Sequence, residues 1–143
     1  MLIKQLSVFI ENKKGRLSEI LDVLKENNID ISALSIADTS GFGILRMIVS
    51  DPETAKIKLS ESGVIVKTNH VIGIIVDDKP GSLAKEIKVL SDNGVVVEYA
   101  YAFLSSSKER ALVVLRADDN ELAEKILAEN GIDMIDPKDC YRI

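Results

Sequence analysis

Hydrophobic positions along this chain follow two periods in turn, and the same succession occurs twice. Apolar residues alternate with polar ones over residues 6–10 and again over 72–76, which predicts two strands. Apolar residues then recur at every third or fourth position over 17–24 and again over 83–90, which predicts two helices of about three turns. The chain therefore reads as a duplicated unit.

A glycine segment stands between strand and helix in both copies. The first copy reads ENKKGRL and contains Gly15, and the second reads DDKPGSL and contains Gly81, a shift of 66 residues. Gly63 and Gly131, much later in each copy, are 68 residues apart. The landmarks between them shift by 67, so the spacing predicts that each copy holds one small insertion and no more.

Four further strands follow from β-branched runs over 29–36 and 95–103 and from strand-like runs over 44–49 and 111–116. Asp51 before Pro52 is typical of a helix N-cap, and Asp118 or Asp119 is expected to start the equivalent helix. Gly63 and Gly131 are expected to end these helices. Residues 64–66 and 132–135 then supply one last strand per copy, and residues 137–143 form a tail of no assigned structure.

Each copy follows the order β-α-β-β-α-β, which predicts an α+β fold of two tandem ferredoxin-like units. We divide the chain into repeat 1, residues 1–69, and repeat 2, residues 70–143 with a short C-terminal tail. Residues 68–70 contain no Gly/Ser-rich or Pro-rich linker, which favours two repeats that are packed together.

Composition narrows the class of protein. Hydrophobic residues make up 46% of the 143 residues and charged residues 29%, the balance of an ordinary globular protein. A net charge of -5 without a dense Lys/Arg stripe disfavours nucleic acid as a partner. Apolar runs of a few residues are far below the ~18 that cross a membrane, and the N-terminus lacks a signal-peptide pattern. The single Cys140 fits a reducing compartment, so we expect a cytoplasmic protein.

The loop and helix of each copy resemble those of the ACT domain, a small amino-acid-sensing regulatory module of metabolic enzymes. The resemblance rests on a strand, an N-x-x-G-x-L loop, an amphipathic helix ending in NNIDI and a strand-turn-strand. Repeat 1 is similar to the serine-sensing ACT domain of phosphoglycerate dehydrogenase, in which two asparagines hold the effector. Those positions are Asn12 and Asp30 here, and Asp78 and Val96 in repeat 2. The histidine of that family pattern is Ile10 in this chain.

Elementary chemistry supports a ligand at this loop. Backbone amides from Gly15 to Leu17, at the start of a helix, favour a carboxylate, and Asn12 and Asp30 offer oxygen acceptors to an ammonium group. Alternatively, Asn12 caps the helix or shapes the turn, Asp30 is an exposed acid, and the loop cations are merely solvated. The predicted ligand-binding residues are Asn12, Lys13, Lys14, Gly15, Arg16, Leu17 and Asp30 in repeat 1, with Asp78, Lys79, Gly81, Ser82 and Leu83 in repeat 2.

In the ACT family the effector lies between paired domains, so the two polar positions can come from different units. If the two repeats of one chain pair, Asn12 faces Val96 and Asp78 faces Asp30. If like repeats pair across a homodimer, Asn12 meets Asp30 of the other chain. The sequence leaves both arrangements open.

The resemblance implies a non-catalytic regulatory protein that binds a free L-amino acid, needs no cofactor or metal, and acts through a partner enzyme or a change of oligomer, expected to be a homodimer. An alternative is a dedicated regulatory subunit of a biosynthetic enzyme such as acetolactate synthase. An enzyme is disfavoured because the sequence has no Ser/His/Asp set, metal cluster, P-loop or dinucleotide-binding glycine pattern. His70 and Cys140 are expected to be structural. An RNA-binding module is disfavoured by the acidic balance.

Overall fold

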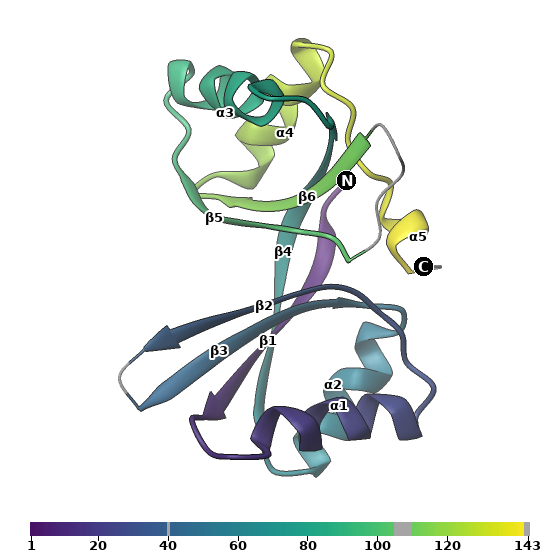
Figure 1. Ribbon diagram of the computed structural model, residues 1–143. Coiled ribbons are helices and arrows are strands. Elements are labelled where there is room, and N and C mark those ends of the chain that lie inside the picture. The colour runs from purple at the N-terminus through teal and green to yellow at the C-terminus, as the bar shows by residue number, and fades with distance from the viewer. Residues whose placement is uncertain (40, 105–109, 142–143) are drawn as a thin grey trace. The chain divides into compact units, whose positions relative to one another are not determined.

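The computed structural model describes residues 1–39, 41–104 and 110–141, which form two compact units (Figure 1). The first-repeat unit contains Lys4–Asn69 together with Cys140 and Tyr141 from the C-terminal end. The second-repeat unit contains His70–Asp139 together with Met1–Ile3. Each end of the described chain therefore belongs to the unit that is built from the other repeat.

The first-repeat unit has the predicted βαββαβ order. Its strands lie in the order β2-β3-β1-β4, and β3 is antiparallel to both β1 and β2, with Leu6 opposite Met47. Leu6, Ile20 and Leu24 belong to one buried core. The elements are β1 (Ile3–Glu11), α1 (Arg16–Glu26), β2 (Ile31–Thr39), β3 (Phe42–Val49), α2 (Pro52–Glu61) and β4 (Ile65–Asp77).

The second-repeat unit contains the C-terminal part of β4 and a core of its own around Ile72, Leu90 and Leu127. Its strands lie in the order β4-β6-β5, with Ile72 opposite Leu115 in an antiparallel pair. The further elements are α3 (Ser82–Asp92), β5 (Val97–Ala102), β6 (Arg110–Ala117), α4 (Asn120–Glu129) and a short α5 (Pro137–Cys140) in the tail that the sequence left unassigned. The ferredoxin-like fold is confirmed, with all six predicted elements in the first-repeat unit and all but the last strand in the second-repeat unit.

The regular strand predicted over residues 132–135 is wrong. These residues make one isolated bridge, between Met134 and Ile74, and two backbone hydrogen bonds to β4. Pro137 follows almost at once, has no N–H to extend a ladder, and begins α5. The chain consequently leaves the edge of β4 before a strand can develop.

Aspartates start α2 and α4, as predicted. Asp51 accepts a hydrogen bond from the backbone N–H of Thr54 at 3.1 Å, and Asp119 accepts one from Leu122 at 3.1 Å. Asp119, rather than Asp118, is therefore the N-cap of α4.

The extra length of repeat 2 lies in one place. Leu6 and Ile72 are 66 residues apart, whereas their strand partners Met47 and Leu115 are 68 apart. Equivalent residues of β2 and β5 are still 66 apart, whereas their partners on β3 and β6 are 68 apart. Both extra residues therefore fall between β5 and β6. The expectation of one small insertion in each copy is therefore wrong, because both extra residues belong to repeat 2.

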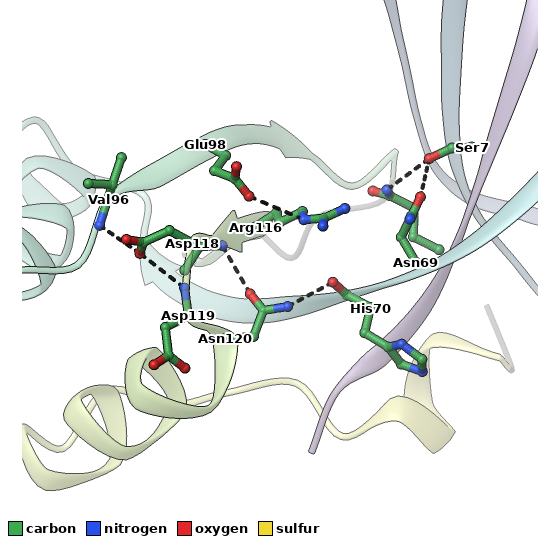
Figure 2. A network of polar contacts seen from close by, with 11 residues as sticks. Ser7, Asn69, His70, Val96, Glu98, Arg116, Asp118, Asp119 and Asn120 are labelled. Carbon is green, nitrogen blue, oxygen red and sulfur yellow. Dashed lines mark hydrogen bonds and ion pairs between the residues drawn. The ribbon is translucent and has the colours of Figure 1, made fainter.

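Polar side chains are buried on β1 and β2 as well as apolar ones. Gln5 and Ser32 are fully buried, and the Ser32 hydroxyl donates to the carbonyl oxygen of Cys140 at 2.8 Å. The Ser7 hydroxyl donates to Asn69 Oδ1 at 2.5 Å (Figure 2). Hydrogen bonding offsets the cost of removing these groups from water.

Among the described residues, no helix is long and apolar enough to span a membrane.

Candidate functional site

Gly15 and Gly81 give the two strand-to-helix loops the same backbone geometry. Gly15 has φ 84° and ψ -5°, and Gly81 has φ 87° and ψ -9°, so both are left-handed. L side chains rarely adopt this region, which explains why a glycine stands before each helix. The sequence identified these corners correctly.

The start of α1 presents backbone donors. Its first helical hydrogen bond runs from Glu19 N to Gly15 O at 3.0 Å. The N–H groups of Leu17 and Ser18 come before Glu19 in the helix, so they make no helical hydrogen bond. The helix dipole adds partial positive charge at this end. A carboxylate is the chemical group that such an end favours.

Charges in the first loop are mostly paired. Lys13 Nζ lies 2.7 Å from Glu11 Oε2, and Arg16 lies 3.0 Å from Glu19. The hydrogen bond and charge of Lys13 hold the pKa of the Glu11 carboxyl below its usual range. Within the described part of the chain, Lys14 has no ion-pair partner, so it is the loop cation that remains for an anionic ligand. A hollow of about 280 Å³ is lined by Glu11, Lys13, Lys14, Arg16 and Glu19.

Asn12 binds β2 rather than capping α1. Its side-chain amide donates to Asp38 Oδ1 at 2.7 Å, whereas the residue that caps α1 is Gly15, without a side-chain bond. Gly43 lies between them on β3, opposite both Ile10 and Asp38. A Cβ at Gly43 would lie 3.3 Å from Asn12 Oδ1, so a side chain there would crowd Asn12 where it crosses β3.

Asp38 was missed by the sequence analysis. It is an isolated acid at the end of a strand, and only the strand register brings it to Asn12. The amide oxygen of Asn12 and the carboxylate of Asp38 together form an exposed pair of acceptors.

Asp30 lies at the opposite end of α1. Its backbone N–H donates to the Ser50 hydroxyl at 2.9 Å, and its carbonyl accepts from Ser50 N at 2.9 Å, so its position is fixed while its carboxylate is exposed. The 11 residues of α1 span about 16 Å, so one unit does not bring Asn12 and Asp30 onto the same small ligand. Beside Asp30 is a hollow of about 360 Å³, lined by Leu21, Leu24, Lys25, Asn28, Ile29, Asp30 and Ile31.

The second repeat lacks an acid at the position of Asp30. Val96 stands there, and its backbone N–H donates to Asp118 Oδ1 at 3.0 Å (Figure 2). The same carboxylate oxygen accepts the N–H of Asp119. The Asp118 carboxylate thus accepts hydrogen bonds from two backbone N–H groups. The Val96 side chain is exposed and has no hydrogen-bond acceptor.

His70 takes part in this network through its backbone. Asn120 donates to the His70 carbonyl oxygen at 2.9 Å and accepts from Ala117 N at 3.0 Å, which ties the start of α4 to β4 and β6 (Figure 2). The imidazole of His70 makes none of these bonds, and the residue is exposed.

Of the predicted residues in the second loop, Ser82 lines a cavity of about 370 Å³. Asp78, Lys79, Gly81 and Leu83 do not line it. No pattern in the sequence indicated this cavity. Comparing the repeats position by position would have given a signal, because Glu86 stands where repeat 1 has Ile20. The cavity is lined by Asp77, Ser82, Lys85, Glu86, Val89, Arg110, Asn130, Gly131, Ile132 and Asp133.

Comparison with known proteins supports the resemblance seen in the sequence. A family model described as an ACT domain pair matches residues 1–143. The crystal structure of protein BT0572 from Bacteroides thetaiotaomicron is 41% identical, with 100% of this chain and 98% of that chain covered and a TM-score of 0.94. No curated protein matches the chain.

More distant structures share the fold. The regulatory subunit of aspartate kinase from Thermus thermophilus, in its ligand-free form, is 16% identical with a TM-score of 0.66. That from Thermus flavus is 17% identical with a TM-score of 0.58. In both comparisons 90% of this chain and 93% of the other chain are covered.

Proposed function

Because the chain belongs to the ACT domain family, as an ACT domain pair, we propose that it is a regulatory protein that binds a free L-amino acid and does not convert it. The observation that carries this proposal is the left-handed Gly15 turn, which begins α1 three residues after Asn12 and its hydrogen bond to Asp38. A carboxylate donor site and ammonium acceptors at one loop match the two charged ends of an amino acid.

In this proposal the ligand carboxylate docks on the amides of Leu17 and Ser18, with Lys14 adding positive charge. The ligand ammonium donates to Asn12 Oδ1 and to Asp38. Lys14 also lines the hollow of this loop, together with Lys13 and Arg16.

We place Asp30 on the same ligand, but from a second copy of the chain. Asn12 and Asp30 lie at opposite ends of α1, so they meet only if two units pair. Pairing with repeat 2 would set Asn12 against Val96, which cannot accept an ammonium proton. A homodimer in which repeat 1 pairs with repeat 1 therefore forms two complete sites, each with Asn12 from one chain and Asp30 from the other. Repeat 2, which contains Asp78, then serves mainly as scaffold.

Ligand binding would then be transmitted to a metabolic enzyme in the cytoplasm through the shape of the dimer. The regulatory subunits of aspartate kinase from the two Thermus species share this fold. A subunit dedicated to one biosynthetic enzyme is the narrower form of the same proposal.

The test is a thermal-shift screen of the purified protein against the standard L-amino acids, with each D-enantiomer as control. A ligand at ~100 times its dissociation constant should stabilise the fold by about 2.7 kcal/mol. We expect one or a few chemically related L-amino acids to raise the melting temperature, and no amino acid to be consumed. Failure of every L-amino acid to do so would reject the proposal.

A further inference from the structure

The cavity in the second-repeat unit is lined in part by charged side chains that repeat 1 lacks. Glu86 stands at the position of Ile20, which is a core residue in repeat 1, and Asp133 stands at the position of Ile65. Arg110 lies opposite Asp77 in the strand register, where repeat 1 has Phe42 opposite Glu11. Two copies of one unit thus differ by a set of charges that faces a single cavity.

The cavity carries an excess of negative charge. Its acids are Asp77, Glu86 and Asp133, and its bases are Lys85 and Arg110. Arg110 is 2.9 Å from Asp133, so this pair neutralises itself. Asp77 and Glu86 then face the cavity with Lys85 as the remaining cation.

Glu86 is the side chain in need of a partner. Its Oε2 atom is removed from solvent and has no hydrogen-bond partner, a costly state for a carboxylate oxygen. Burial and the charges of Asp77 and Asp133, opposed by those of Arg110 and Lys85, raise the pKa of this carboxyl. A cation in the cavity would relieve this repulsion, and a cation with N–H groups would also donate hydrogen bonds to the acidic side chains that line it.

The occupant is better matched by an organic ion than by a metal. Among the described residues, no group of three or more His, Cys, Asp or Glu side chains could hold a metal ion. Val89 and Ile132 add apolar surface to the lining. The volume of about 370 Å³ falls in the range of ~300–1,000 Å³ that is usual for small-molecule sites.

We propose that this cavity is a second binding site, which takes a small alkylammonium ion. The ammonium group donates to Glu86 and Asp77, and the alkyl chain lies against Val89 and Ile132. Such a ligand has no carboxylate, so it lacks the group that the helix-start amides at the Gly15 loop would bind. The site is thus independent of the amino-acid site proposed above.

The test is a titration of the ¹⁵N-labelled full-length protein with n-butylammonium chloride at constant ionic strength, followed by amide chemical shifts. We expect saturable shifts confined to residues 77–89, 110 and 130–133. Tetramethylammonium, which has no N–H, should bind at least tenfold more weakly. Glu86→Gln, which keeps the shape of the side chain, should weaken n-butylammonium binding at least tenfold.

Two matched variants separate this site from the rest of the molecule. Glu98→Gln removes an exposed carboxylate on β5 that pairs with Arg116, and Asn12→Ala alters the proposed amino-acid site. Both should bind n-butylammonium like the parent protein. The proposal is overturned if the shifts do not saturate, if tetramethylammonium binds equally well, or if folded Glu86→Gln binds within twofold of the parent.

Discussion

The side-chain amide of Asn12 donates a hydrogen bond to Asp38 across Gly43, with 2.7 Å between Nδ2 and Oδ1. This bond joins the end of β1 to the end of β2 and fixes which atom of Asn12 faces a ligand. With its N–H₂ group engaged, Asn12 presents its oxygen as an acceptor. An ammonium group is the complement of that arrangement.

Asp38→Ala should therefore weaken amino-acid binding more than it weakens the fold. The exposed hydrogen bond contributes about 1 kcal/mol at most to the free energy of unfolding, whereas loss of the acceptor and of Asn12 orientation should lower affinity by roughly fivefold to tenfold. Urea unfolding and calorimetry measure the two effects. Asp22→Ala, which removes an exposed acid from α1, is the control and should change neither.

Gly15→Ala should destabilise the first-repeat unit by about 1–2 kcal/mol, because alanine must adopt φ 84°. The cost is backbone strain and not a clash, since no atom lies within 4 Å of the added Cβ. Gly81→Ala meets the same conditions and should cost a similar free energy in urea unfolding. Affinity for the amino acid should fall only in Gly15→Ala, and equal losses in both variants would contradict the assignment to repeat 1.

Glu86 should make stability depend on pH. The pKa of its carboxyl is raised in the folded state, so protonated Glu86 favours folding. This contribution to the free energy of unfolding is fully present below the unfolded pKa of ~4.3 and is lost as pH rises through the folded pKa. Glu86→Gln should accordingly be more stable relative to the parent protein at pH 7 than at pH 4, in urea unfolding without added amines. A difference that does not change with pH would show that the carboxyl titrates normally.

Cutting the chain after Asn69 should damage both units. Residues 1–69 would keep Met1–Ile3, which belong to the second-repeat unit, and would lose Cys140 and Tyr141, which hydrogen-bond to Ser32 and Lys4 in the first-repeat unit. We expect this fragment to self-associate or precipitate, and the intact chain to unfold in one transition. Analytical ultracentrifugation and calorimetry test this, and a monomeric, cooperatively folded fragment is the contrary result.

The fold was predictable because its signals are local. Alternating strands, apolar helix stripes and the glycine before each helix all lie within short windows, and the ACT resemblance ordered them correctly. The error at residues 132–135 arose because a short apolar run looks like a strand even where Pro137 draws the chain away.

The sites were only partly predictable. Gly15 and Asn12 are marked by their motif, but Asp38 becomes relevant only through the register of β2, β3 and β1. The cavity around Glu86 depends on four separate segments, and no local pattern reports their meeting. Proximity between distant residues is set by tertiary packing, which a motif does not contain.

The most direct test of the central claim is calorimetry with the amino acid that the thermal screen selects, on the parent protein and three variants. Asn12→Ala and Asp30→Ala should each lower affinity by about fivefold or more, since each removes an acceptor from the ammonium, whereas Asp78→Ala should bind like the parent. If Asn12→Ala and Asp30→Ala bind like the parent while Asp78→Ala abolishes binding, the working site is the second loop and the account given for repeat 1 is contradicted.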